Sequence, residues 1–252
     1  MKQLLLSTTY FGPIQWYQKL YRAESVQIER WESFQKQTYR NRCIIATTNG
    51  SQALTVPIER QFTINCIKDI RISDHGNWRH LHWNALQSAY GESPFFEYYQ
   101  DDIRPFFEQR WDYLFDFNEA IREKMCELLD IQPKVDYSKE FTVVSEESTP
   151  SGRAKNLLFT DDYIVGSEGL ASKSSVRSAL PLATAGTQEL KPSTVNYMKD
   201  YRMVIRPKNP EPDPDFTPKR YYQVYEQKHG FLPNLSILDL LFNMGPESIF
   251  YL

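Results

Sequence analysis

Residues 3–29 read QLLLSTTYFGPIQWYQKLYRAESVQIE, and this stretch decides the fold. Its first seven residues, Gln3 to Thr9, are an apolar run that is typical of a short buried strand. Gly12 and Pro13 follow and predict the start of a helix, because proline lacks the N–H that a first helical turn leaves unpaired. Residues 25–29 then alternate as a strand does. The stretch therefore predicts a strand–helix–strand unit.

The next part of the chain has the pattern of β-structure. Two strand-like runs, 43–48 and 53–58, flank Asn49-Gly50, and this dipeptide between such runs predicts a hairpin. Residues 64–72 alternate through isoleucines and predict a further strand.

Helical spacing begins at Trp78 and continues to about residue 130, which predicts a block of three helices. Residues 141–144 and 201–206 again resemble strands. Near the end, Ser236 predicts a helix N-cap, and Asp239 is placed to complete a capping box. The final helix is so apolar that we expect it to be buried.

These elements predict an α/β fold with a mixed sheet, a helical block at about 78–130 and a buried C-terminal helix. Residues 1–252 are expected to form a single domain. At about 145–194 the chain loses its periodicity and is rich in Ser, Thr, Gly, Ala and Pro. A solvated insertion and a lid are the two interpretations of that segment.

The composition excludes several classes of protein. The net charge of −3 disfavours a nucleic-acid binder that works by bulk charge. No run approaches the roughly 20 apolar residues that a membrane span needs, and no signal peptide is recognisable. Three scattered cysteines exclude a disulfide scaffold and agree with reduced thiols in a cytoplasmic protein.

The polar run at residues 34–42, FQKQTYRNR, is the strongest candidate site. Its cations Lys36, Arg40 and Arg42 are suited to a carboxylate or phosphate, and the amides of Gln35 and Asn41 add polar contacts. The alternative is a solvated hairpin or edge strand on which the cations prevent aggregation.

His80 and His82 are candidates for a general base because histidine titrates near neutral pH. On a helix an i, i+2 pair points in different directions, so no metal site is expected. Hydrogen-bonded structural histidines are the alternative. Glu29, at the end of the second strand, is a candidate carboxylate.

The turn at residues 9–13, which contains Tyr10, places a helix N-terminus after a strand, where an anion can bind. Phosphate-binding loops usually contain several glycines, whereas this turn has one. No Walker, G-x-G-x-x-G or G-x-S-x-G motif is present. The many aromatic side chains at 93–117 have the spacing of core residues, with an exposed stacking or partner surface as the alternative.

Several blocks together resemble the WbqC-like family of bacterial proteins. In chain order these blocks are TYFGPIQWY (9–17), FQKQTYRNR (34–42), WRHLHWNA (78–85), SPFFEYY (93–99), FDFN (115–118) and GFLPNLSILDLLFNMGPE (230–247). The form is most similar to members from the Bacteroidetes. The sequence departs from the family's pattern after Glu29 and across 145–194.

The resemblance implies a transferase of surface-polysaccharide biosynthesis that passes an acyl or aminoacyl group to an amino sugar. His82, His80 and Glu29 would then be catalytic. The substrate would contact the side chains Tyr10, Gln35, Lys36, Arg40, Asn41, Arg42 and Asn84. The partner is a small molecule or glycan precursor, and the sequence points to no particular cofactor or oligomeric state. The alternative is a non-catalytic binding or scaffold protein.

Overall fold

The computed structural model describes residues 3–59, 66–144 and 198–252. The predicted insertion or lid at 145–194 lies outside these residues, as do the first residues of the strand predicted at 64–72.

The strand–helix–strand unit forms as its sequence predicts. It consists of β1 (Leu4–Ser7), α1 (Ile14–Arg22) and β2 (Val26–Glu29), and β1 pairs with β2 in parallel. Both strands are almost wholly buried, because parallel strands are covered on both faces. This explains the apolar sequence of β1, whereas β2 alternates between apolar and polar residues. Gly12 is required in the connecting turn because a Cβ there would lie 2.4 Å from Oγ1 of Thr9.

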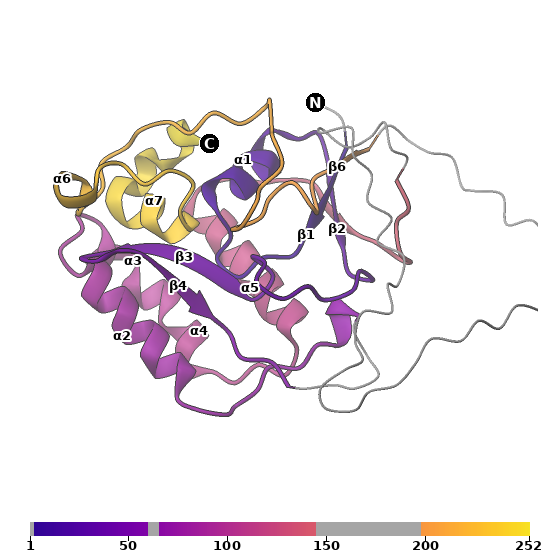
Figure 1. The fold of residues 1–252 in the computed structure, drawn as a ribbon, viewed down its shortest axis with the longest axis horizontal. Helices are drawn as coiled ribbons and strands as arrows, with labels where there is room; N and C mark the ends of the chain where they lie inside the picture. Colours follow the sequence, from indigo (N-terminus) through magenta and orange to yellow (C-terminus); the bar gives the residue numbers. More distant parts are fainter. Residues whose placement is uncertain (1–2, 60–65, 145–197) are drawn as a thin grey trace, which may run out of the picture.

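Two short strands complete a parallel sheet with the order β5-β2-β1-β6. They are β5 (Val135–Tyr137) and β6 (Lys199–Asp200), which come from distant parts of the chain (Figure 1). The carboxyl ends of all four strands therefore lie at one edge of the sheet.

The strand predicted at 201–206 is wrong, because only residues 199–200 pair. The carboxylate of Asp200 accepts a hydrogen bond from the backbone N–H of Arg202, which turns the chain out of the sheet. The strand predicted at 141–144 is also wrong, since the N–H of Thr142 bonds to the carboxylate of Glu29.

The predicted hairpin is confirmed as β3 (Arg42–Thr47) and β4 (Gly50–Thr55), which pair antiparallel. Gly50 has a φ of +101°, a conformation that suits glycine. Among the described residues the parallel and antiparallel pairings thus belong to two separate sheets. The described part of the predicted strand at 64–72 instead contains a 3₁₀ turn, η1 (Ile67–Asp69), whose first N–H bonds to the carbonyl of Glu32.

The helical block begins at the predicted residue. It contains α2 (Trp78–Tyr90), α3 (Phe96–Ile103), α4 (Pro105–Glu108) and α5 (Leu114–Leu128). Most aromatic side chains of the block are buried in the core, as their spacing predicts: Phe96, Tyr99, Phe106, Phe107, Phe115 and Phe117. Tyr98 is exposed.

The C-terminal part consists of α6 (Glu226–His229), α7 (Ile237–Met244) and η3 (Gly245–Tyr251). In Figure 1, α7 and α2 lie on opposite sides of the hairpin. The prediction that the last helix is buried is confirmed over residues 237–243, and Ser236 caps it through the N–H of Leu238.

Asp239 does not complete a capping box. Its buried carboxylate instead accepts hydrogen bonds from the hydroxyls of Tyr90 and Tyr221 and from the amide of Gln223. Burial raises its pKa to about 6. The side chain therefore connects α7 to α2 and to the 221–223 segment, instead of bonding to its own helix.

Replacement of Leu240 by alanine tests the burial of α7. Leu240 is fully buried, so Leu240→Ala is expected to lower the free energy of unfolding by about 2–5 kcal/mol through lost burial and a cavity. Leu81, on α2, is 62% exposed, and Leu81→Ala is the matched control, expected to change it by less than about 0.5 kcal/mol. Urea denaturation measures both. Equal losses in the two variants would contradict the packing of α7 described here.

Candidate functional site

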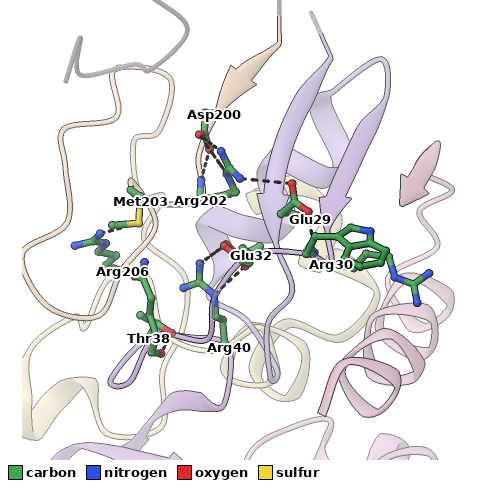
Figure 2. A network of polar contacts seen from close by, with 12 residues as sticks. Glu29, Arg30, Glu32, Thr38, Arg40, Asp200, Arg202, Met203 and Arg206 are labelled. Atoms are coloured by element: carbon green, nitrogen blue, oxygen red, sulfur yellow. Dashed lines mark hydrogen bonds and ion pairs between the residues drawn. The ribbon is translucent and has the colours of Figure 1, made fainter. Parts of the chain in front are cut away.

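A cluster of charged side chains lies at the carboxyl edge of the parallel sheet (Figure 2). Ser7, Glu29 and Asp200 end β1, β2 and β6, and Ser138 follows β5. In open α/β sheets, ligands bind outside the carboxyl ends of the strands. We call these residues, together with Glu32, Arg40, Arg202 and Arg206, the edge site.

Glu29 is fully buried and its carboxylate connects several segments. Oε1 accepts from the N–H of Trp31 at 2.8 Å and from the hydroxyl of Ser138 at 2.5 Å. Oε2 accepts from the N–H of Thr142 at 2.8 Å and lies 3.5 Å from Nη1 of Arg202. These contacts fix the position of Glu29 and surround its carboxylate with three hydrogen-bond donors and one cation.

Glu32 and Arg40 form a buried ion pair beside β1. Their side chains are 2% and 3% exposed. Nε of Arg40 donates to Oε1 of Glu32 at 2.8 Å, and Nη2 donates to Oε2 of the same carboxylate, so the contact is bidentate. Nη2 also donates to the hydroxyl of Ser7 at 2.8 Å. The pair thus holds the 32–40 segment against the end of β1.

Arg202 forms a second buried pair. It donates to both carboxylate oxygens of Asp200, with distances of 2.8–3.2 Å, and to the carbonyl of Thr142 at 3.1 Å. Arg206 comes from the same segment, is half-buried, and donates to the thioether sulfur of Met203 at 2.8 Å. The edge site therefore brings three carboxylates and three guanidinium groups together.

The structure separates the residues of the predicted polar run. Arg40 belongs to the edge site, whereas Lys36 is exposed and Gln35 is half-buried, its carbonyl accepting from the hydroxyl of Thr38. The amide of Asn41 donates to the carbonyl of Val56, and Nε of Arg42 donates to the hydroxyl of Thr55. Arg42 therefore belongs to the hairpin as the first residue of β3, and Asn41 bonds to the residue that follows β4.

The predicted proton-transfer residues also lie in different places. Glu29 lies at the edge site. His82 is buried in the aromatic core, where Nδ1 is 2.9 Å from the hydroxyl of Tyr10, itself fully buried. His80 is exposed on α2, with Nε2 2.8 Å from the amide nitrogen of Asn84. His80 also lines a surface pocket of about 280 Å³.

The environment of His82 determines its charge. Burial lowers its pKa to about 4, and a contact with the backbone of Thr55 opposes this shift. At pH 7 the imidazole is therefore neutral. Trp78, Phe107 and Tyr10 surround the ring, which accounts for the cost of charging it.

Sequence reasoning missed several members of the edge site: Ser7, Glu32, Ser138, Asp200, Arg202 and Arg206. The sequence contains a usable signal for Ser7 and Glu32, which lie at or just after the ends of the first two strands. Polar residues in such places lie at the ligand-binding edge of a parallel sheet. The signal was hidden at 199–206, where only two residues pair with β1.

A membrane-spanning helix and a metal site each have requirements that the described residues do not meet. None of their helices has the length and apolar character that a membrane crossing requires. Within residues 3–59, 66–144 and 198–252, no three His, Cys, Asp or Glu side chains are grouped so that they could hold a metal ion.

Comparison with known proteins gives two matches. The model of the WbqC-like protein family matches residues 8–173 and 212–251. "Uncharacterized protein Rv1507c" of Mycobacterium tuberculosis (strain ATCC 25618 / H37Rv) is 24% identical over 222 residues, which cover 87% of this chain and 83% of that protein. A search of solved structures found no match. Asp200, Arg202 and Arg206 lie outside the matched ranges.

The Arg40–Glu32 pair gives a testable prediction for stability. Arg40→Met leaves a buried carboxylate without its cation, so it is expected to lower the free energy of unfolding by about 3–5 kcal/mol. The double variant Arg40→Met/Glu32→Leu replaces both charges by apolar groups and is expected to be markedly more stable than the single variant. Urea denaturation measures both. A double variant no more stable than Arg40→Met would contradict the pairing.

The lowered pKa of His82 predicts a dependence of stability on pH. Between about pH 6.5 and 4 the unfolded chain binds a proton that the folded chain does not, so stability falls as the pH decreases, by roughly 3 kcal/mol in total. His82→Asn is expected to lose this part of the dependence. His80→Asn, at the exposed histidine, is the matched control and is expected to retain it. Unfolding curves across this range, identical for wild type and His82→Asn, would overturn the assignment.

Proposed function

The chain belongs to the WbqC-like protein family, and from this premise we propose that it is a transferase of surface-polysaccharide biosynthesis. It passes an acyl or aminoacyl group to the amine of a sugar precursor in the cytoplasm. The observation that carries the proposal is the edge site, where polar side chains from the ends of four parallel strands meet.

The location of the edge site supports binding of a small molecule. Ligands of open α/β sheets bind at this edge because the strand ends and following loops supply polar groups there. The guanidinium groups of Arg40, Arg202 and Arg206 suit an anionic part of the substrate, and carboxylates suit its amine or hydroxyl groups. A nucleotide-linked amino sugar has groups of both kinds.

The transfer itself requires one proton acceptor. The amine nitrogen of the sugar bonds to the carbonyl carbon of an acyl ester or thioester, and the acyl C–O or C–S bond breaks. The amine proton passes to a base, which returns a proton to the departing oxygen or sulfur, so that an alcohol or thiol is released. Of the three candidates Glu29, His80 and His82, only Glu29 lies at the edge site. We therefore propose that the carboxylate of Glu29 orients the amine or accepts its proton. The catalytic roles of His80 and His82 stay predictions.

The alternative is a non-catalytic binding or scaffold protein. It would require an exposed aromatic surface at residues 93–117. Phe96, Tyr99, Phe106 and Phe107 are buried there and Tyr98 is exposed, so these residues give this alternative little support. The mutual pairing of charges at the edge site is the observation in its favour.

An activity assay tests the proposal. Wild-type protein is incubated with nucleotide-linked amino sugars and acyl or aminoacyl donors, and N-acylated sugar is detected by mass spectrometry. Glu29→Gln is expected to reduce the rate at least ten-fold, because it removes the carboxylate charge at the edge site. Glu97→Gln, at an exposed glutamate of α3, is the matched control and is expected to retain the wild-type rate.

Folding of both variants is checked by circular dichroism. If no donor and acceptor pair yields product, and no substrate raises the melting temperature of the wild type, the scaffold alternative is favoured.

A further inference from the structure

The three arginines of the edge site have different partners. Arg40 and Arg202 each bond to a carboxylate, as described above. Within the described part of the chain, no carboxylate lies within ion-pair distance of Arg206. The thioether sulfur of Met203 is a weak acceptor, and Nε of Arg206 is buried without a hydrogen bond.

The surroundings of Arg206 disfavour its charge. Burial is the largest cause that lowers the pKa of Arg206, and the positive charge of Arg40 lowers it further. The negative charge of Glu211 raises the pKa and opposes both. A guanidinium nevertheless stays protonated at neutral pH. The folded protein therefore holds a half-buried positive charge with one buried N–H that has no acceptor and another that bonds only to a thioether sulfur.

A second donor nearby has the same property. The side chain of Arg202 is only 4% exposed, and its Nη1 is buried and forms no hydrogen bond. This nitrogen lies 3.5 Å from Oε2 of Glu29. Both arginines come from the segment that leaves β6 at the carboxyl edge, and Figure 2 shows Arg206 and Arg30 on opposite sides of the Glu32–Arg40 pair. The segment after β6 thus supplies two cationic side chains, each with a buried donor that forms no hydrogen bond.

We propose that Arg206 is a substrate-binding residue that holds a phosphoryl group of the substrate at the edge site. This inference rests on the proposed function and narrows its substrate to a phosphorylated or nucleotide-linked compound. The planar guanidinium can bond to two phosphate oxygens at once. A phosphoryl group at neutral pH carries up to two negative charges, so it also relieves the repulsion between Arg206 and Arg40, which a carboxylate does less well.

A purely structural role for Arg206 makes a different prediction. Glu29, Glu32 and Asp200 together carry one more charge than Arg40 and Arg202, and Arg206 would be their counter-charge. In that case the removal of its charge destabilises the protein without any ligand. As a substrate anchor, Arg206 instead contributes nothing to the stability of the free protein, and its removal affects binding.

Binding of inorganic pyrophosphate, measured by isothermal titration calorimetry at pH 7.5, tests the proposal with three variants. Arg206→Gln removes the charge and is expected to weaken binding at least ten-fold, and Arg206→Lys, which retains the charge but not the planar fork, is expected to lie between Arg206→Gln and wild type. Arg110→Gln is the matched control, because the side chain of Arg110 is 84% exposed, and it is expected to bind as wild type. Malonate tests whether a dicarboxylate binds at the same place.

Each result either supports or overturns the assignment. Wild-type binding that Arg206→Gln weakens, with the free energy of unfolding unchanged or higher, supports it. The assignment is overturned if pyrophosphate does not bind wild type, or if it binds Arg206→Gln as well as wild type. It is also overturned if malonate binds as tightly as pyrophosphate, or if the free energy of unfolding is clearly lower in Arg206→Gln. Binding that depends on Arg206 without any N-acylated product refutes the proposed reaction alone, whereas product formation unaffected by Arg206→Gln refutes this inference alone.

Discussion

The buried ion pair between Arg40 and Glu32 is the contact on which the carboxyl edge of the sheet depends. Both side chains are almost inaccessible to water, so each charge requires the other. Through Ser7 the pair reaches the end of β1, and the amide of Asn118 on α5 donates to the carbonyl of Arg40. The pair thus joins β1 to the loop after β2, and the backbone of Arg40 bonds to the longest helix described.

A second buried carboxylate, Glu29, organises the other half of the edge. It accepts hydrogen bonds from its own loop and from the residues after β5, and it forms an ion pair with Arg202 after β6. The short strands β5 and β6 would contribute little by themselves, because each offers only two or three residues to the sheet. Charge-assisted hydrogen bonds beyond the strand ends therefore supplement the ladder. The same bonds place polar groups where a parallel sheet binds ligands.

An element was predicted correctly where local sequence determines its conformation, and incorrectly where contacts with distant side chains do. Strongly periodic segments, such as α2 and α5, and the Asn49-Gly50 hairpin formed where they were predicted, since their patterns report local conformation and one buried face. Residues 141–144 and 201–206 have the composition of strands, but the backbone N–H of Thr142 bonds to the carboxylate of Glu29, and that of Arg202 bonds to the carboxylate of Asp200. Such competition between a side chain and the sheet cannot be read from a local pattern.

The sequence by itself determined the α/β class, the first strand–helix–strand unit, the hairpin, the helical block and the burial of the last helix. It also indicated Arg40, as a cation of the polar run at 34–42, and Glu29, as a carboxylate at the end of the second strand. Only the tertiary structure decided which charges meet: it placed Arg40 at the edge site, Arg42 on the hairpin and His82 among aromatic rings. The physical reason is that ion pairs such as those of Arg202 with Glu29 join residues far apart in the chain. Their formation depends on how the sheet is assembled, which no short stretch of sequence specifies.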